Sequence, residues 1–181
     1  MNVNRDVIDR IERLGVRYYI TGSEALGRYA EMRTTRDMDI VLDLSPARYE
    51  DIIRPSFEDE YLVADLVVWP QKAIGSVIHR TALAKVDLIL RGDDRGDDPW
   101  SRSAMDRRVR AEDPVVGAAW FISREDLLLA KLEWWMGGAS DVQLRDCRSI
   151  IRLNPDLDWA YVERYAGLLG VREPLEQIRG G

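Results

Sequence analysis

The segment "MDIVLDL", residues 38–44, constrains the fold most strongly. It is almost continuously apolar, the pattern of a strand that is covered on both faces. The carboxylates of Asp37 and Asp39 nevertheless flank Met38 at its beginning. Because residues i and i+2 of a strand point to the same face, we expect both carboxylates to project side by side.

Two neighbouring carboxylates at a buried strand need a group that offsets their negative charge. They repel each other, and burying one without a partner costs free energy. An isolated D-x-D pattern is most often a solvated turn, so further features are needed to favour a metal site. A divalent cation would resolve the repulsion, since Mg²⁺ takes oxygen ligands and is commonly held by one or two carboxylates plus substrate phosphates.

Gly22 and Ser23 lie between "VRYYIT", which predicts a strand, and "EALGRYA", which predicts a short helix with Ser23 as its N-cap. A Gly-Ser pair is more often a simple turn than a binding site. Backbone N–H groups and a small hydroxyl at the start of a helix can nevertheless bind phosphate. We therefore treat this turn as a candidate phosphate site.

A third carboxylate, Asp87, stands between apolar residues in the predicted strand "AKVDLIL". A carboxylate in such surroundings needs a partner or a metal. One alternative is an aspartate at a sheet edge that pairs with an arginine. If Asp87 instead converges on Asp37 and Asp39, the three carboxylates would form a two-metal site.

The remaining pattern predicts a mixed αβ region followed by helices. Helices are expected over residues 3–14, 47–55, 122–136, 140–153, 156–170 and 172–180, and strands over 76–81 and 84–92. The segment 61–69 fits a strand or a buried helical turn, and the Gly- and Asp-rich segment 92–103 predicts a loop. We expect a catalytic domain over residues 1–115 and a helical region packed on it over residues 116–181.

Composition favours a cytoplasmic globular protein without a membrane partner. No apolar run approaches the roughly 20 residues that cross a bilayer, and the N-terminal segment lacks the apolar core of a signal peptide. The single cysteine, Cys147, cannot form an intrachain disulfide. A net charge of −6 disfavours a large nucleic-acid interface.

The order of these motifs resembles the DNA polymerase β-like nucleotidyltransferase superfamily. Its hallmark is hG[GS], then hDhDh, then a third carboxylate on a later strand. The positions that match are Gly22 and Ser23, then Asp37 and Asp39 within the R-x-T-x-D-x-D segment that begins at Arg33, and then Asp87. Arg36 departs from the pattern because it stands where the generic motif has an apolar residue. The resemblance implies an α+β nucleotidyltransferase fold, with a mixed small sheet flanked by helices and a C-terminal helical bundle.

The helices after residue 122 add a second resemblance. "SREDLLLAKLEWW" and "SDVQLRDCRSII" are similar to the C-terminal region of AbiEii-type toxin nucleotidyltransferases, in which a lysine and an aspartate face the nucleotide. Lys131 and Asp146 are the matching positions. A lysine can neutralise phosphate charge, and Asp146 could orient it. The simpler alternatives are a solvent-facing Lys131 and an Asp146 that pairs with a nearby cation.

The resemblance implies Mg²⁺-dependent transfer of a nucleoside monophosphate from an NTP to an acceptor hydroxyl, with two metal ions. The expected metal ligands are Asp37, Asp39 and Asp87, and these residues with Lys131 are the expected catalytic residues. The expected nucleotide-binding residues are Gly22, Ser23, Arg33, Lys131 and Asp146. The acceptor stays open between tRNA, a protein and a small molecule such as an aminoglycoside, and a toxin would have a cognate antitoxin. The alternative is a protein of this fold that binds a nucleotide or partner without turnover.

Overall fold

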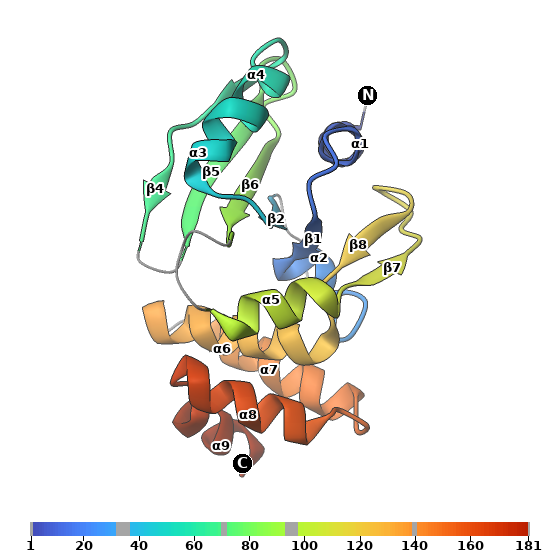
Figure 1. Ribbon diagram of the computed structural model, residues 1–181. Helices are drawn as coiled ribbons and strands as arrows, with labels where there is room; N and C mark the ends of the chain where they lie inside the picture. The colour runs from blue at the N-terminus through green and yellow to red at the C-terminus, as the bar shows by residue number, and fades with distance from the viewer. Residues whose placement is uncertain (1, 32–36, 70–71, 93–97, 139–140, 181) are drawn as a thin grey trace.

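The computed structural model describes residues 2–31, 37–69, 72–92, 98–138 and 141–180 (Figure 1). Eight strands of the described part form one mixed sheet in the order β3-β5-β6-β2-β1-β8-β7, with β4 paired to β5. The strands are β1 (Tyr18–Thr21), β2 (Met38–Leu42), β3 (Tyr61–Val63), β4 (Val67–Val68), β5 (Ala73–His79), β6 (Lys85–Leu90), β7 (Val109–Ala111) and β8 (Ala119–Phe121). The sheet is thus the mixed sheet that the sequence predicted.

Helices precede, interrupt and follow the sheet. They are α1 (Val3–Arg13), α2 (Gly22–Leu26), α3 (Pro46–Arg48), the π-helical turn η1 (Tyr49–Ile53), α4 (Arg54–Phe57), α5 (Pro99–Asp106), α6 (Arg124–Gly138), α7 (Asp141–Leu153), α8 (Trp159–Leu169) and α9 (Arg172–Arg179). Figure 1 shows α6 to α9 gathered at one end of the sheet, with α8 and α9 farthest from it. One hydrophobic core runs through the sheet and these helices. The expected domain boundary at residue 115 stays a prediction.

Strand β2 lies in the middle of the sheet, as its apolar sequence predicted. It pairs antiparallel with β1 and parallel with β6, and Met38, Ile40 and Leu42 are buried. β6 in turn pairs antiparallel with β5, and these are the two strands that the sequence predicted over residues 76–81 and 84–92. These pairings fix which side chains of four strands stand next to one another.

The C-terminal helices are held to α5 by the N-terminus of α6. Ser123 Oγ accepts a hydrogen bond from the N–H of Asp126 at 3.2 Å, which caps the start of the helix, and donates one to Asp126 Oδ2 at 2.6 Å. The buried Asp126 carboxylate also accepts hydrogen bonds from Trp100 Nε1 of α5 at 2.9 Å and from the hydroxyl of Tyr161 of α8 at 2.6 Å. One buried acid therefore joins three helices.

Three expectations differ from the structure. Part of the expected loop at 92–103 is helical, because Asp98 caps α5 by accepting a hydrogen bond from the N–H of Ser101 at 3.0 Å. Residues 93–97 of that loop lie outside the described ranges. Ser23 is not an N-cap, since α2 already begins at Gly22. Strands β7 and β8 were not predicted because each is only three residues long.

Within the described ranges, none of the helices combines the length and apolar character that a membrane-spanning helix requires.

Replacing Ser123 by alanine tests the cap that anchors α6. The change removes a donor and an acceptor next to the buried Asp126, so we expect the free energy of unfolding to fall by about 1–3 kcal/mol. Urea denaturation at pH 7 measures it. Ser45→Ala is the matched control, because Ser45 Oγ also caps a helix but its hydrogen bond from the N–H of Arg48 is exposed. Equal losses in the two variants would contradict the anchoring role of Ser123.

Candidate active site

Strand register brings the predicted carboxylates together. Thr21 on β1 is opposite Asp39 on β2, Asp39 is opposite Asp87 on β6, and Asp87 is opposite Ser76 on β5. Four polar side chains thus form one row across the sheet. The parallel pairing of β2 with β6 is the reason that two acids distant in sequence become direct neighbours.

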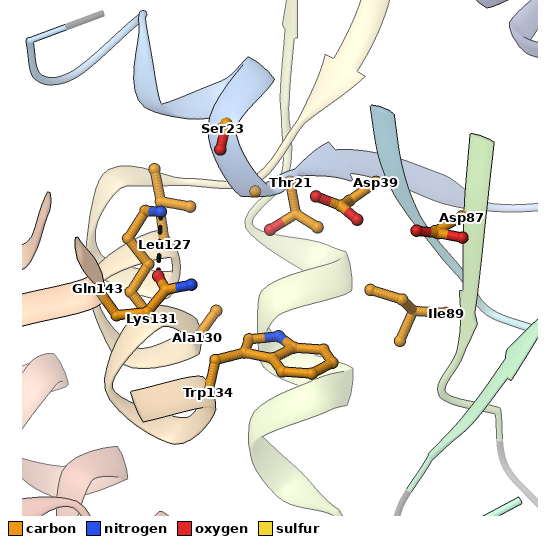
Figure 2. Close-up of a pocket in the computed structure, with 11 residues that line it drawn as sticks. Thr21, Ser23, Asp39, Asp87, Ile89, Leu127, Ala130, Lys131, Trp134 and Gln143 are labelled. Atoms are coloured by element: carbon orange, nitrogen blue, oxygen red, sulfur yellow. Dashed lines mark hydrogen bonds between the residues drawn. The ribbon is translucent and has the colours of Figure 1, made fainter. Parts of the chain in front are cut away.

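Three members of this row, Thr21, Asp39 and Asp87, line a cleft of about 300 Å³ between the sheet and α6. Figure 2 shows the Asp39 and Asp87 carboxylates on one side of the cleft and Lys131 on the other, with Ser23 at the start of α2. The lining residues are Thr21, Gly22, Ser23, Asp39, Asp87, Ile89, Leu127, Ala130, Lys131, Trp134 and Gln143. The cleft lining therefore includes five of the eight residues that the sequence analysis predicted for the metal and nucleotide site.

Asp39 is the most perturbed acid in the cleft. Burial and, to a smaller extent, the neighbouring Asp87 carboxylate together raise the pKa of its carboxyl to about 6, against the opposing effect of Lys131. Among the residues that the structure describes, none donates a hydrogen bond to this carboxylate. Asp39 is thus a partly desolvated acid whose charge is left for a group in the cleft to neutralise.

Asp87 and Asp37 are connected by Lys85, which the sequence analysis overlooked. The Lys85 ammonium lies 2.8 Å from Asp87 Oδ2 and 3.7 Å from Asp37 Oδ2. Ser76 Oγ donates a further hydrogen bond to Asp87 Oδ1 at 2.5 Å. Lys85 and Asp87 are separated by two positions in "AKVDLIL", so strand alternation places them on one face and could have revealed the lysine. The hydrogen bond to Asp87 is the largest cause of the raised pKa of Lys85.

Gly22 presses its backbone against Asp39. Its φ is +65°, in the left-handed region that favours glycine, and a Cβ built on it would lie 2.1 Å from Asp39 Oδ2. Two independent constraints therefore require glycine here. Ser23 follows Gly22 and also lines the cleft, as expected of a phosphate-binding turn, although its contact with phosphate stays a prediction.

The simpler alternative, a solvent-facing Lys131, is wrong. Its side chain is buried, with 3% of the residue exposed, and its ammonium donates to Asp146 Oδ2 at 2.8 Å and to Gln143 Oε1 at 3.4 Å. Asp146 on α7 is buried too, so it contacts the cleft through Lys131. The structure thus brings Lys131 and Asp146 together as a buried ion pair that orients the ammonium at the cleft wall.

The predicted metal ligands Asp37, Asp39 and Asp87 lie at neighbouring positions at the start of β2 and on β6, and their binding of metal stays a prediction. Among the described residues, no group of three or more His, Cys, Asp or Glu side chains is arranged to hold a metal ion. Asp37 is half exposed at the start of β2, and Lys85 stands between it and Asp87. The adjacent pair Asp39 and Asp87 still fits Mg²⁺, which needs only one or two carboxylates when phosphate oxygens complete its coordination. Arg33 lies outside the described ranges.

Replacing Gly22 by alanine tests its contact with Asp39. Gly15→Ala is a matched control, because Gly15 has nearly the same φ, +66°, but nothing within 4 Å of an added Cβ. We expect the control to lose about 1–2 kcal/mol from backbone strain alone. Gly22→Ala should lose about 1–3 kcal/mol more through overpacking. Urea denaturation measures both, and the extra loss should shrink in an Asp39→Ala background. An equal loss in the two glycine variants would show that the contact is unimportant.

The Asp39 carboxylate should destabilise the protein at neutral pH. Its folded pKa of about 6 exceeds the unfolded value near 4, so the stability present at low pH is lost as pH rises through 6. In metal-free buffer, Asp39→Asn should therefore stabilise the fold by up to about 3 kcal/mol at pH 7.5 relative to its effect at pH 4. Urea denaturation at both pH values measures this, and a pH-independent effect would contradict it.

Comparisons with known proteins identify the fold. No protein-family model matches the sequence. No curated protein matches it either. Among solved structures, a nucleotidyltransferase-like antigenic protein from Paracoccidioides brasiliensis matches with 17% identity and a TM-score of 0.54, covering 97% of this chain and 89% of that one. A putative nucleotidyltransferase from Thermotoga maritima matches with 19% identity and a TM-score of 0.55, covering 79% and 89%.

A third match is ANT(2″)-Ia in complex with adenylyl-2″-tobramycin, with 10% identity and a TM-score of 0.56, covering 92% of this chain and 94% of that one. At these identities the likeness concerns the fold. The α+β prediction is confirmed, and the chain has the nucleotidyltransferase fold with a C-terminal helical region.

Proposed function

We propose that this protein is a Mg²⁺-dependent nucleotidyltransferase that moves a nucleoside monophosphate from an NTP to an acceptor hydroxyl. The observation that supports this most is the pairing of Asp39 with Asp87 across β2 and β6, at the wall of a cleft that also contains Gly22, Ser23 and Lys131. The nucleotidyltransferase fold of the neighbouring structures agrees with it.

Asp39 and Asp87 would hold Mg²⁺, with Asp37 next to them. When bound, Mg²⁺ would neutralise negative charge on the phosphates and polarise the phosphoryl group. Asp39 suits this role because its carboxylate is desolvated and none of the described residues donates a hydrogen bond to it. The charge that destabilises the free protein would then stabilise the complex.

The other residues would position the triphosphate. Lys131, kept in place by Asp146, would offset charge on the outer phosphates. Ser23 and the N–H groups beside Gly22 would donate hydrogen bonds to the same oxygens. Asp87, oriented by Ser76 and Lys85, would direct the acceptor hydroxyl toward the α-phosphorus and take up its proton as pyrophosphate leaves. Positioning and charge neutralisation supply most of the catalysis in phosphoryl transfer.

A small-molecule acceptor is the form of this proposal that we favour. The net charge of −6 disfavours a polyanionic tRNA and would attract a cationic acceptor. The fold of ANT(2″)-Ia, whose structure contains adenylyl-2″-tobramycin, is compatible with such an acceptor. The resemblance to AbiEii-type toxins rests on the helical sequence motifs alone, so a tRNA or protein acceptor, and an antitoxin partner, remain predictions from sequence.

A transfer assay tests the proposal. We expect the protein with Mg²⁺ and α-labelled NTP to transfer label to a hydroxyl acceptor, with an aminoglycoside, bulk tRNA and a cell extract as the panel. Asp87→Asn should lower the rate about 100- to 1,000-fold, the loss typical for removal of a group that acts on the transition state. Asp51→Asn, an exposed aspartate outside the cleft, is the control and should keep the rate.

Calorimetry with Mg²⁺·NTP separates the proposal from its main alternative. Binding without transfer to any acceptor would favour a nucleotide-binding protein without turnover. An absence of NTP binding would contradict both.

A further inference from the structure

Trp134 is an unusual lining residue for a cleft that contains two acids and a buried lysine. It lies on α6 one turn after Lys131, so the two side chains project on the same side of the helix. Residues 125–132 of this helix are buried, whereas Trp134 is 39% exposed. An indole that borders a cleft and remains partly exposed has apolar surface available for a ligand.

Lys72 supports the indole from outside the cleft. Its ammonium lies 3.9 Å from the centroid of the Trp134 ring, within the range of a cation–π interaction. Trp134 lines the cleft, whereas Lys72 does not belong to the lining. Burial is the largest cause of the lowered pKa of Lys72, against the opposing effect of Glu133. The indole thus has a cationic neighbour in Lys72 and also lines the cleft.

The cleft has two chemically different ends. Figure 2 shows the indole of Trp134 below the Asp39 carboxylate, extended toward Ile89. Ala130, Ile89 and Trp134 give this end an apolar lining, whereas Asp39, Asp87 and Ser23 line the other end with oxygen atoms. With Mg²⁺ bound to the two acids, the polar end would take phosphate oxygens and the apolar end a flat ring, which together are the parts of a nucleotide.

We propose that Trp134 is the stacking platform for the nucleobase of the NTP, with Lys72 bracing it. This inference rests on the proposed function and adds the position of the base. Stacking supplies affinity through the π-face that every base has, so it discriminates poorly between bases. ATP, GTP, CTP and UTP should therefore all bind, with the larger purine rings preferred over pyrimidines.

Calorimetry with two probes tests the platform. Mg²⁺·ATP has a base and Mg²⁺·tripolyphosphate has none, so the difference between their affinities isolates the contribution of the base. We expect Trp134→Leu to weaken ATP binding about 5- to 100-fold and to leave tripolyphosphate binding unchanged. Trp134→Phe should retain most of the ATP affinity because phenylalanine keeps an aromatic face. Met136→Leu, an exposed position on the same helix outside the cleft lining, is the control.

The outcomes separate the two levels of the proposal. Unchanged ATP affinity in Trp134→Leu would overturn the platform while leaving the nucleotidyltransferase proposal intact. Equal losses for ATP and tripolyphosphate would also overturn it, because they would indicate a disturbed phosphate site. If the unmodified protein binds neither probe, the proposed function falls and the platform falls with it.

Discussion

The arrangement of the cleft depends on the pairing of Asp39 with Asp87 across β2 and β6, where burial removes water from the Asp39 carboxylate. Strand register imposes this contact, since β2 and β6 are parallel neighbours and the two acids are direct partners. Burial, with a smaller contribution from the Asp87 carboxylate, raises the pKa of Asp39 to about 6. The buried Asp39 carboxylate therefore opposes folding at neutral pH, and the rest of the protein has to compensate for its charge.

The surrounding elements limit this cost in different ways. Lys85 and Ser76 satisfy Asp87, and the Lys131–Asp146 ion pair supplies a buried cation near Asp39. Gly22 leaves room for the Asp39 carboxylate where any other residue would collide with it. Stability itself comes from the continuous hydrophobic core and from the capped start of α6. The well-packed scaffold therefore offsets the free-energy cost of keeping the Asp39 carboxylate in the cleft.

The site could be predicted from sequence wherever a local pattern carried the information. Alternation in a strand put Asp37 and Asp39 on one face, and an acid inside an apolar strand singled out Asp87. The burial of Lys131 could not be read from α6 itself, because it depends on the packing of α7 against that helix. Lys85 was not predicted, although its position two residues before Asp87 places both side chains on one face of the strand. A buried acid in a strand needs a counter-ion, and that requirement could have singled out this lysine. Strands β7 and β8 are too short for a periodic signal. The role of Trp134 depends on its position in the cleft, which tertiary packing determines.

A crystal structure with Mg²⁺ and a non-hydrolysable NTP tests the central claim most directly. We expect a metal ion about 2.1 Å from carboxylate oxygens of both Asp39 and Asp87, with the triphosphate alongside Ser23 and Lys131. Nucleotide bound elsewhere, or bound in the cleft with no ion shared by the two acids, would contradict it.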